Sequence, residues 1–70
     1  MNEIIATIVD VFELPEGTAP STTVEVDSLA SLSLMSQVAR RWRVRLDPAR
    51  LERMSSIAEI ADYIAAATAA

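Results

Sequence analysis

The chain has 70 residues, of which 51% are hydrophobic, carries a net charge of −4 and contains neither cysteine nor histidine. A domain of this size buries only about 60% of the surface that its unfolded chain exposes, which argues against a deep enzyme pocket. Without cysteine and histidine, disulfide bonds, cysteine nucleophiles, histidine bases and the common zinc sites are excluded, and no acidic segment has the spacing of a calcium loop. No nucleophile can be paired with a base, so we expect a small non-catalytic module with no catalytic residue and no metal site.

The amino-terminal segment has the features of neither a signal peptide nor a membrane anchor. An acid, Glu3, stands where a signal peptide carries bases, and Thr7 and Asp10 interrupt the apolar residues that follow. No apolar run approaches the roughly 20 residues needed to cross a bilayer. We therefore expect a cytoplasmic protein with no membrane partner.

Charge is distributed unevenly along the chain. Residues 1–39 contain six acids and no base, whereas residues 40–53 contain all six arginines. A basic block of this kind can bind nucleic acid. However, Arg40 and Arg41 fall in the last turn of a predicted helix, where cations offset the helix dipole. Phosphate would also repel an acidic module at long range, so we expect no nucleic-acid partner.

The first predicted helix covers about residues 3–14. Its hydrophobic residues recur at helical spacing and form one apolar face: Ile4, Ile5, Ile8, Val9 and Phe12. Pro15 opposes continuation of the helix, and residues 15–27 form a long loop by their turn-forming composition. Val24 and Val26 are placed to pin this loop onto the rest of the chain.

The second predicted helix, about residues 28–42, carries apolar residues on two separate arcs. One arc is a core stripe that consists of Leu34, Val38 and Trp42. The other lies nearer Ser28 and consists of Leu29, Leu32, Ser36 and Ala39. Crossing helices in a short chain could bury both arcs, or the second arc could be a docking surface.

Asp27 and Ser28 stand at the start of this helix. Asp27 is a strong N-cap residue, because its carboxylate can accept the free N–H groups of the first turn, and Ser28 is then the first helical residue. A phosphate ester on the Ser28 hydroxyl would meet the remaining free N–H groups and the positive end of the helix dipole. The pair is therefore either a plain helix cap or an attachment point for an anionic group.

The remaining predicted helices cover about residues 48–54 and 56–67. Asp47-Pro48 is a strong helix start, an N-cap followed by proline at the first helical position. Ser56 and Glu59 have the spacing of a capping box at the start of the last helix. The buried stripe of that helix is expected to contain Ile57, Ile60, Ala61 and Ile64. These elements predict an all-α fold in a single domain, residues 1–70. It is a small bundle of four helices, three main ones and a short third, with a long loop between the first two.

Several features occur together along residues 27–64, over half of the chain. They are the triplet Asp27-Ser28-Leu29, the register of Leu34, Val38 and Trp42, the loop residues Val44 and Leu46, and the ending Ser55-Ser56-Ile57-Ala58-Glu59-Ile60-Ala61-Asp62-Tyr63-Ile64. This arrangement resembles the acyl and peptidyl carrier proteins, which shuttle thioester-bound intermediates between enzymes. The triplet alone is a weak motif, but its place within a complete plan of four helices makes the resemblance specific.

The resemblance implies a defined chemistry. Ser28 would receive 4′-phosphopantetheine from coenzyme A through a phosphopantetheinyl transferase, and the thiol of the arm would hold acyl, polyketide or aminoacyl intermediates as thioesters. Asp27 would position the serine and present negative charge to the transferase, and Leu29, Leu32 and Ser36 would form part of the surface that partner enzymes recognise. The further partners implied are a loading enzyme, either an acyltransferase or an adenylating ligase, and synthase or tailoring enzymes. The bundle itself would be a non-catalytic monomer.

One departure from the family pattern bears on the pathway. Carriers of fatty-acid synthesis have a second helix rich in Asp and Glu, whereas the polar residues here are Ser31, Ser33, Ser36, Gln37, Arg40 and Arg41. Such a surface would not attract basic docking patches by electrostatic steering. We therefore expect a discrete carrier of a specialised-metabolite pathway, as in polyketide, nonribosomal peptide or antibiotic biosynthesis. The alternative is an unmodified small helical module for protein–protein interaction, in which Ser28 would have no special role.

Overall fold

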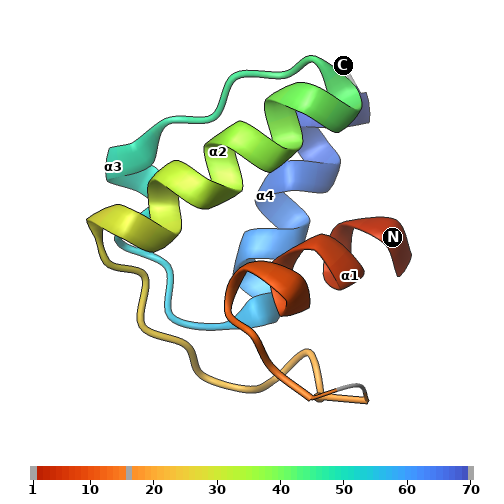
Figure 1. The fold of residues 1–70 in the computed structure, drawn as a ribbon, viewed down its shortest axis with the longest axis vertical. Coiled ribbons are helices and arrows are strands. Elements are labelled where there is room, and N and C mark those ends of the chain that lie inside the picture. The colour runs from red at the N-terminus through yellow and green to blue at the C-terminus, as the bar shows by residue number, and fades with distance from the viewer. Residues whose placement is uncertain (1, 16, 70) are drawn as a thin grey trace.

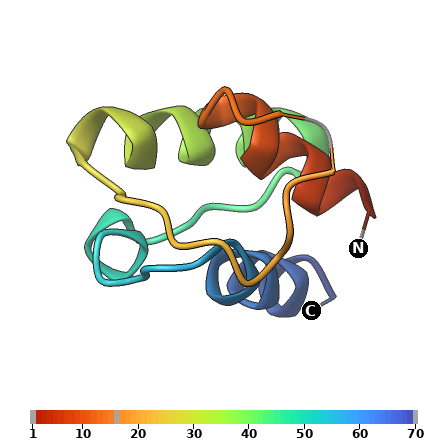
Figure 2. The ribbon, with the colours of Figure 1, turned by 90° about the horizontal axis from the view of Figure 1, so that it is seen from below.

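A computed structural model describes residues 2–15 and 17–69. Within them the chain forms four helices, α1 (Asn2–Val11), α2 (Ser28–Trp42), α3 (Pro48–Leu51) and α4 (Ile57–Ala69), and no sheet. Helix α2 runs across the front of α4, with α1 beside it (Figure 1). The perpendicular view separates α1 and α2 in one layer from α3 and α4 in the other (Figure 2). The expected all-α bundle with a short third helix and a long first loop is confirmed.

The core lies between the two layers and draws on every helix. It consists of Ile4, Ile8, Val26, Leu34, Val38, Leu46, Leu51, Ile57, Ile60, Ala61 and Ile64. The expected stripe of α4 is fully buried, and so are Leu34 and Val38 of α2, while Trp42 is half-buried at the edge. Complete burial of one such side chain contributes about 1.5–3 kcal/mol, so one continuous apolar interior holds the layers together.

Helix α1 ends at Val11, whereas the sequence predicted a helix to residue 14. Glu13 adopts a left-handed conformation with φ of 54°. Its N–H donates to the Asp10 carbonyl at 3.1 Å, and the Leu14 N–H donates to the Val9 carbonyl at 3.0 Å. These two bonds form a Schellman motif, which closes the helix before the proline is reached.

The last two helices also differ from the predicted ranges. Helix α3 ends at Leu51 rather than residue 54, because the next residues form tighter turns with bonds from Arg53 N–H to the Arg50 carbonyl and from Met54 N–H to the Leu51 carbonyl, 3.2 and 3.1 Å long. Helix α4 begins at Ile57, with the predicted first residue 56 acting as its cap, and extends to Ala69 rather than 67. Alanine has the highest helix propensity, which favours this extension.

The long loop between α1 and α2 is fixed to the start of α4. The first N–H of α4 donates to the Thr22 carbonyl at 3.2 Å, and the second donates to the Pro20 carbonyl at 2.8 Å. The Val24 N–H donates in turn to the Ser55 carbonyl at 2.9 Å. A helix start has free N–H groups that need partners. The loop supplies them, and this contact sets the path by which the chain reaches α2.

The capping box of α4 forms with one difference from the expected pattern. The Ser56 hydroxyl accepts from the Glu59 N–H at 3.2 Å. The Glu59 carboxylate reaches back past the cap to accept from the Ser55 N–H at 3.2 Å and from the Ser55 hydroxyl at 3.0 Å. Hydrogen bonds from Ser55, with a smaller contribution from Ser56, lower the pKa of the exposed Glu59 carboxyl below its ordinary value of 4.5.

The segment between α2 and α3 is held at both ends. Arg43 caps α2 in a left-handed conformation, φ 56°, and its N–H donates to the Ala39 carbonyl at 3.0 Å. At the other end the Asp47 N–H donates to the Tyr63 hydroxyl at 2.9 Å. The Arg50 guanidinium lies 4.5 Å from the centre of the Tyr63 ring, a cation–π contact. The segment is therefore joined to the end of α2 through Arg43 and to α4 through Asp47.

Candidate functional site

Asp27 and Ser28 form the amino-terminal end of α2, at a corner of the molecule. Asp27 has an extended backbone, and its carboxylate Oδ1 accepts from the Ala30 N–H at 2.8 Å. This is the geometry of an N-cap, so the residue fixes where the helix begins. Ser28 is the first helical residue, and its side chain is exposed. The sequence therefore places an accessible hydroxyl on a rigid element rather than on a free loop.

The first turn of α2 has backbone donors to spare. Within residues 2–15 and 17–69 no hydrogen bond uses the N–H of Ser28 or of Leu29, since the cap engages only the third N–H of the helix. Free N–H groups at a helix start, together with the positive end of the dipole, favour an anion. A phosphate ester on the Ser28 hydroxyl would lie beside both groups. The residues present therefore fit an anionic attachment.

The other serines of α2 differ from Ser28 in burial or position. Ser31 is buried, and its hydroxyl lies 3.0 Å from the Ser28 carbonyl and 3.4 Å from Glu52 Oε2. It has one proton to donate, and the shorter distance favours the bond within α2. Ser33 and Ser36 are exposed but lie further along the helix, where the backbone N–H groups bond within the helix. Ser28 alone of the four combines exposure with free helix-start donors.

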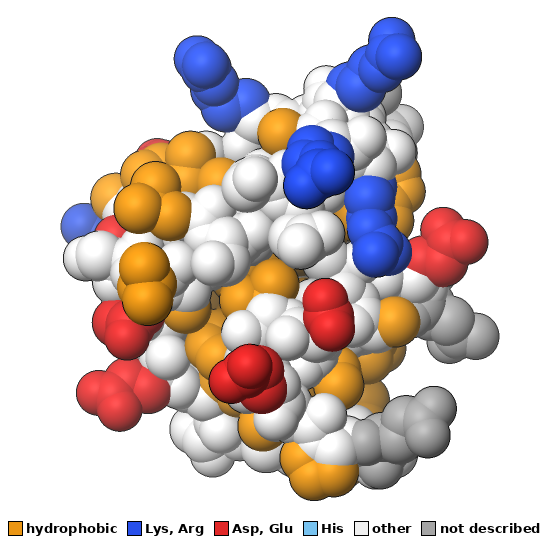
Figure 3. Space-filling view, in the orientation of Figure 1, with side chains coloured by type: hydrophobic (Ala, Val, Ile, Leu, Met, Phe, Trp, Pro, Cys, Tyr) orange, Lys and Arg blue, Asp and Glu red, His pale blue; other side chains and the backbone are white. Residues whose placement is uncertain are grey.

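The second apolar arc of α2 lies outside the core. Leu29 is 75% exposed and Leu32 is 59% exposed, so the alternative in which crossing helices bury both arcs is wrong. Hydrophobic side chains gather over the amino-terminal end of α2, and arginines lie above its carboxyl-terminal end (Figure 3). We name this surface the exposed stripe; it consists of Leu29, Leu32, Ser33, Ser36, Ala39 and Arg40. All of the residues predicted for partner recognition are exposed, and all but Asp27 belong to the stripe.

Among the hollows lined by described residues, two lie beside α2 and are open to solvent. The larger has a volume of about 320 Å³ and lies between α2 and the segment that follows it; its lining residues are Leu32, Met35, Ser36, Ala39, Arg45 and Leu46. The smaller has a volume of about 250 Å³ and is lined by Val11, Phe12, Glu25, Asp27, Leu29, Ala30 and Ser33. The larger is mainly apolar, whereas the smaller has two carboxylates beside an aromatic ring.

The sequence identified the second arc of α2, but it left the exposure of this arc open and gave no indication of either hollow. The walls of both hollows combine α2 with segments distant in the sequence: Arg45 and Leu46 for the larger, and Phe12 and Glu25 for the smaller. The alternation of charged and apolar residues after α2 is consistent with the burial of Leu46. It gave no sign that Arg45 would line a hollow beside the stripe.

Comparison with known families adds an independent observation. The model of a protein family described as a phosphopantetheine attachment site matches residues 2–64, which include α1, α2, α3 and most of α4. Comparisons with curated proteins and with solved structures give no match. In the described part of the chain, no helix is both long enough and apolar enough to span a membrane.

Proposed function

The chain belongs to the family of phosphopantetheine attachment domains, and from that premise we propose that Ser28 is the residue to which the arm is attached. Domains of this family are attachment sites for 4′-phosphopantetheine and serve as carriers, generally without catalytic activity of their own. The observation that carries the assignment is the exposed hydroxyl of Ser28 at the first position of α2, beside two N–H groups that no described residue uses.

The residues around Ser28 would each contribute to holding the group. The N–H groups of Ser28 and Leu29 would bond the phosphate, while the Asp27 cap keeps the first turn of α2 folded. The bound arm would supply a terminal thiol, which carries cargo as a thioester. Leu29 and Leu32 would stay outside the core as contacts for enzymes that approach this end of α2. The chain would thus position the arm and present it, while its partners perform the chemistry.

We further infer the class of partners. A carrier of this family interacts with a phosphopantetheinyl transferase and with the enzymes of its pathway in general. The specific proposal is a carrier for polyketide, aminoacyl or related acyl intermediates of a specialised pathway, served by a loading acyltransferase or adenylating ligase. Its support is α2, which contains two arginines and no acid, unlike the acidic helix of fatty-acid carriers. Basic docking patches would gain nothing from such a surface.

The assignment is tested by intact-mass measurement after incubation with coenzyme A and a broad-specificity phosphopantetheinyl transferase. Parent protein should gain one phosphopantetheinyl group and Ser28→Ala none. Ser33→Ala is the matched control, because Ser33 is exposed on the same helix. Its modification should equal that of the parent. Modification of a folded Ser28→Ala variant would overturn the assignment.

The alternative function is an unmodified interaction module. The exposure of Leu29 and Leu32 supports this function as well as the carrier function. The same measurement separates the two, with the native transferase tested if the broad-specificity enzyme fails. A folded parent protein that neither enzyme modifies would favour the interaction module.

A further inference from the structure

The larger hollow lies on the same side of α2 as Ser28. At about 100° per residue, Met35 and Ala39 lie within about 20° of Ser28 around the helix. Leu32 lies within about 40°, and all three residues line this hollow. Ala30, which lines the smaller hollow, lies about 160° away from Ser28. A group attached to Ser28 is therefore directed along α2 towards the larger hollow.

The larger hollow also lies within reach of an arm on Ser28. At about 1.5 Å per residue, Leu32 and Ala39 lie about 6 and 16 Å beyond Ser28 along the helix axis. The arm has about 13 skeletal bonds from phosphorus to sulfur, and a peptide spans roughly 3.3–3.6 Å with three such bonds, so the extended arm spans about 15 Å. Cargo at its thiol end therefore reaches the far part of the hollow.

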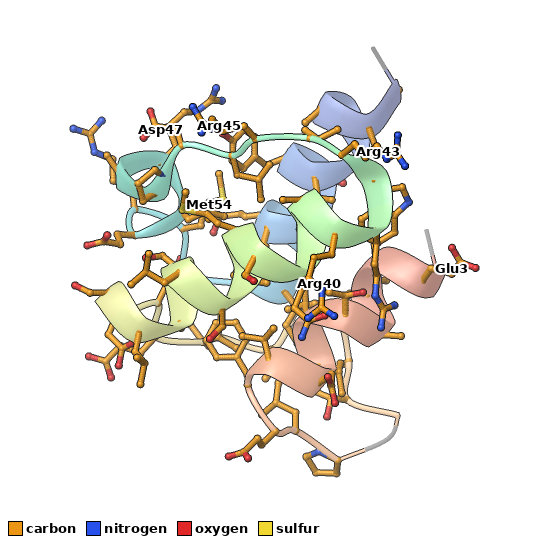
Figure 4. The ribbon with its side chains drawn as sticks, turned by 45° about the horizontal axis from the view of Figure 1, so that its top comes forward. Glu3, Arg40, Arg43, Arg45, Asp47 and Met54 are labelled. Carbon is orange, nitrogen blue, oxygen red and sulfur yellow. The ribbon has the colours of Figure 1, made fainter. Side chains whose placement is uncertain are left out.

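The lining of this hollow combines an apolar wall with one cationic side chain. Leu46 is buried, so the floor of the hollow is continuous with the core. Arg45 is the charged residue among the described lining residues. Figure 4 shows Arg45 on the segment that follows α2, with α1 on the opposite side of α2. A guanidinium beside an apolar recess suits a carboxylate, to which it donates two parallel N–H groups.

The acids nearest to Arg45 in the fold do not line the hollow. Helix α2 contains no acid. Asp47, two positions after Arg45, caps α3, and its Oδ1 accepts from the Ala49 N–H at 3.0 Å. Arg45 itself is exposed, so its guanidinium can turn over the mouth of the hollow and stay in contact with water.

The volume of the hollow limits the size of its occupant. At roughly 30 Å³ for each water-sized group, about 320 Å³ has room for about ten such groups. This accommodates a short acyl group together with the end of the arm. It does not accommodate a long fatty chain.

We propose that the larger hollow holds a short acyl cargo that ends in a carboxylate, and that Arg45 selects this charge. The carbon chain lies against Leu32, Met35 and Leu46, and the Arg45 guanidinium donates to the carboxylate. A cargo that ends in an ammonium group is disfavoured, because it meets a like charge and an apolar wall. The proposal rests on the proposed function and deepens it, because it names the class of cargo carried on Ser28.

A weak site is sufficient here, because the cargo is tethered. A short flexible tether keeps its end at an effective concentration in the millimolar range, roughly. An exposed ion pair changes an equilibrium constant by up to about fivefold. The ratio of bound to free cargo should therefore differ a few-fold between acidic and neutral cargo of the same length.

The test uses the full chain loaded at Ser28 with three cargoes of matched length, succinyl, succinamyl and 4-aminobutyryl. Each is joined to the arm through an amide in place of the thioester, so that it does not hydrolyse. Amide chemical shifts are measured by NMR against protein that carries the arm without cargo. The succinyl group should shift the lining residues of the larger hollow most, the succinamyl group less and the aminobutyryl group least. The succinyl shifts should shrink as salt rises, because exposed charges are screened.

A pair of variants isolates the effect of Arg45. Arg45→Gln should lower the ratio of bound to free succinyl cargo about threefold, to the level of the succinamyl cargo in the parent protein. Arg53→Gln makes the same change in net charge at an exposed position that does not line the hollow. Its succinyl shifts should equal those of the parent. Circular dichroism checks that both variants are folded.

Three outcomes would overturn the proposal: equal shifts with all three cargoes, shifts confined to residues outside the hollow, or equal losses in Arg45→Gln and Arg53→Gln. Failure of the proposed function is seen separately, as absence of a mass increase at Ser28. The hollow is then tested with the unmodified chain and N-propylsuccinamic acid at millimolar concentration. Shifts of the lining residues that Arg45→Gln removes would support the proposal, and their absence would overturn it.

Discussion

Replacing Asp27 by alanine is expected to weaken the start of α2, which carries Ser28. In the folded protein the Asp27 carboxylate accepts from the Ala30 N–H at 2.8 Å. Alanine cannot accept this bond, so a further N–H of the first turn would be left to water. Asn is the informative comparison, because its amide oxygen can keep the cap while its side chain carries no charge.

The size of the effect follows from two contributions. Loss of an N-cap side chain costs about 1 kcal/mol, within a range of roughly 0.5–2, and loss of a negative charge at the helix start costs about 0.3–1 kcal/mol. Asp27→Ala loses both, or about 1–2 kcal/mol, whereas Asp27→Asn loses only the second. In a domain of this size each kcal/mol lowers the melting temperature by about 4–8 °C.

Thermal unfolding followed by far-ultraviolet circular dichroism, with urea titration for the free energy of unfolding, measures both variants. We expect the order parent, Asp27→Asn, Asp27→Ala, from most to least stable. A loss in Asp27→Asn as large as that in Asp27→Ala would show that the charge and not the cap hydrogen bond is what matters. No loss in either variant would refute the cap as the element that fixes the start of α2.

Two further predictions concern the ends of the other elements. Arg43→Gly should stabilise the protein by up to about 1 kcal/mol, because Arg43 is left-handed and glycine adopts that conformation without the side-chain clash. Arg41→Gly, within the regular helix, should instead destabilise by about 0.5–1 kcal/mol, and equal losses in the two urea titrations would contradict this. For Glu59 the folded-state pKa is lowered, so its contribution to stability is present above its ordinary pKa and is lost as pH falls through the folded value. The free energy of unfolding of Glu59→Gln should therefore approach that of the parent on acidification below about pH 4.5, and a constant difference across that range would argue against the serine bonds as the cause.

The sequence was most informative where side-chain chemistry fixes structure. The start of α2 follows from the cap at Asp27, and its inward face follows from the spacing of Leu34 and Val38. The end of α1 was missed because the left-handed residue there is Glu13. Glycine or asparagine usually marks such a position, and a glutamate gives no comparable signal.

Features that depend on distant segments could not be predicted. The loop carbonyls of Pro20 and Thr22 cap α4 through backbone atoms, which leave no trace in side-chain identity. The same holds for the larger hollow, whose wall needs Arg45 and Leu46 to fold back along α2. The sequence placed Leu29 on the second apolar arc of α2. It did not show whether Leu29 is exposed, because exposure depends on which helices cross α2 and where they cross it.

The most direct test of the central claim is to locate the modification within the chain. Protein modified with coenzyme A and a phosphopantetheinyl transferase is digested, and fragment-ion mass spectrometry identifies the residue that carries the group. The account predicts the phosphopantetheinyl group on Ser28 and on none of the other serines of α2. Its presence on Ser33 or Ser36, both exposed on the same helix, would contradict the account.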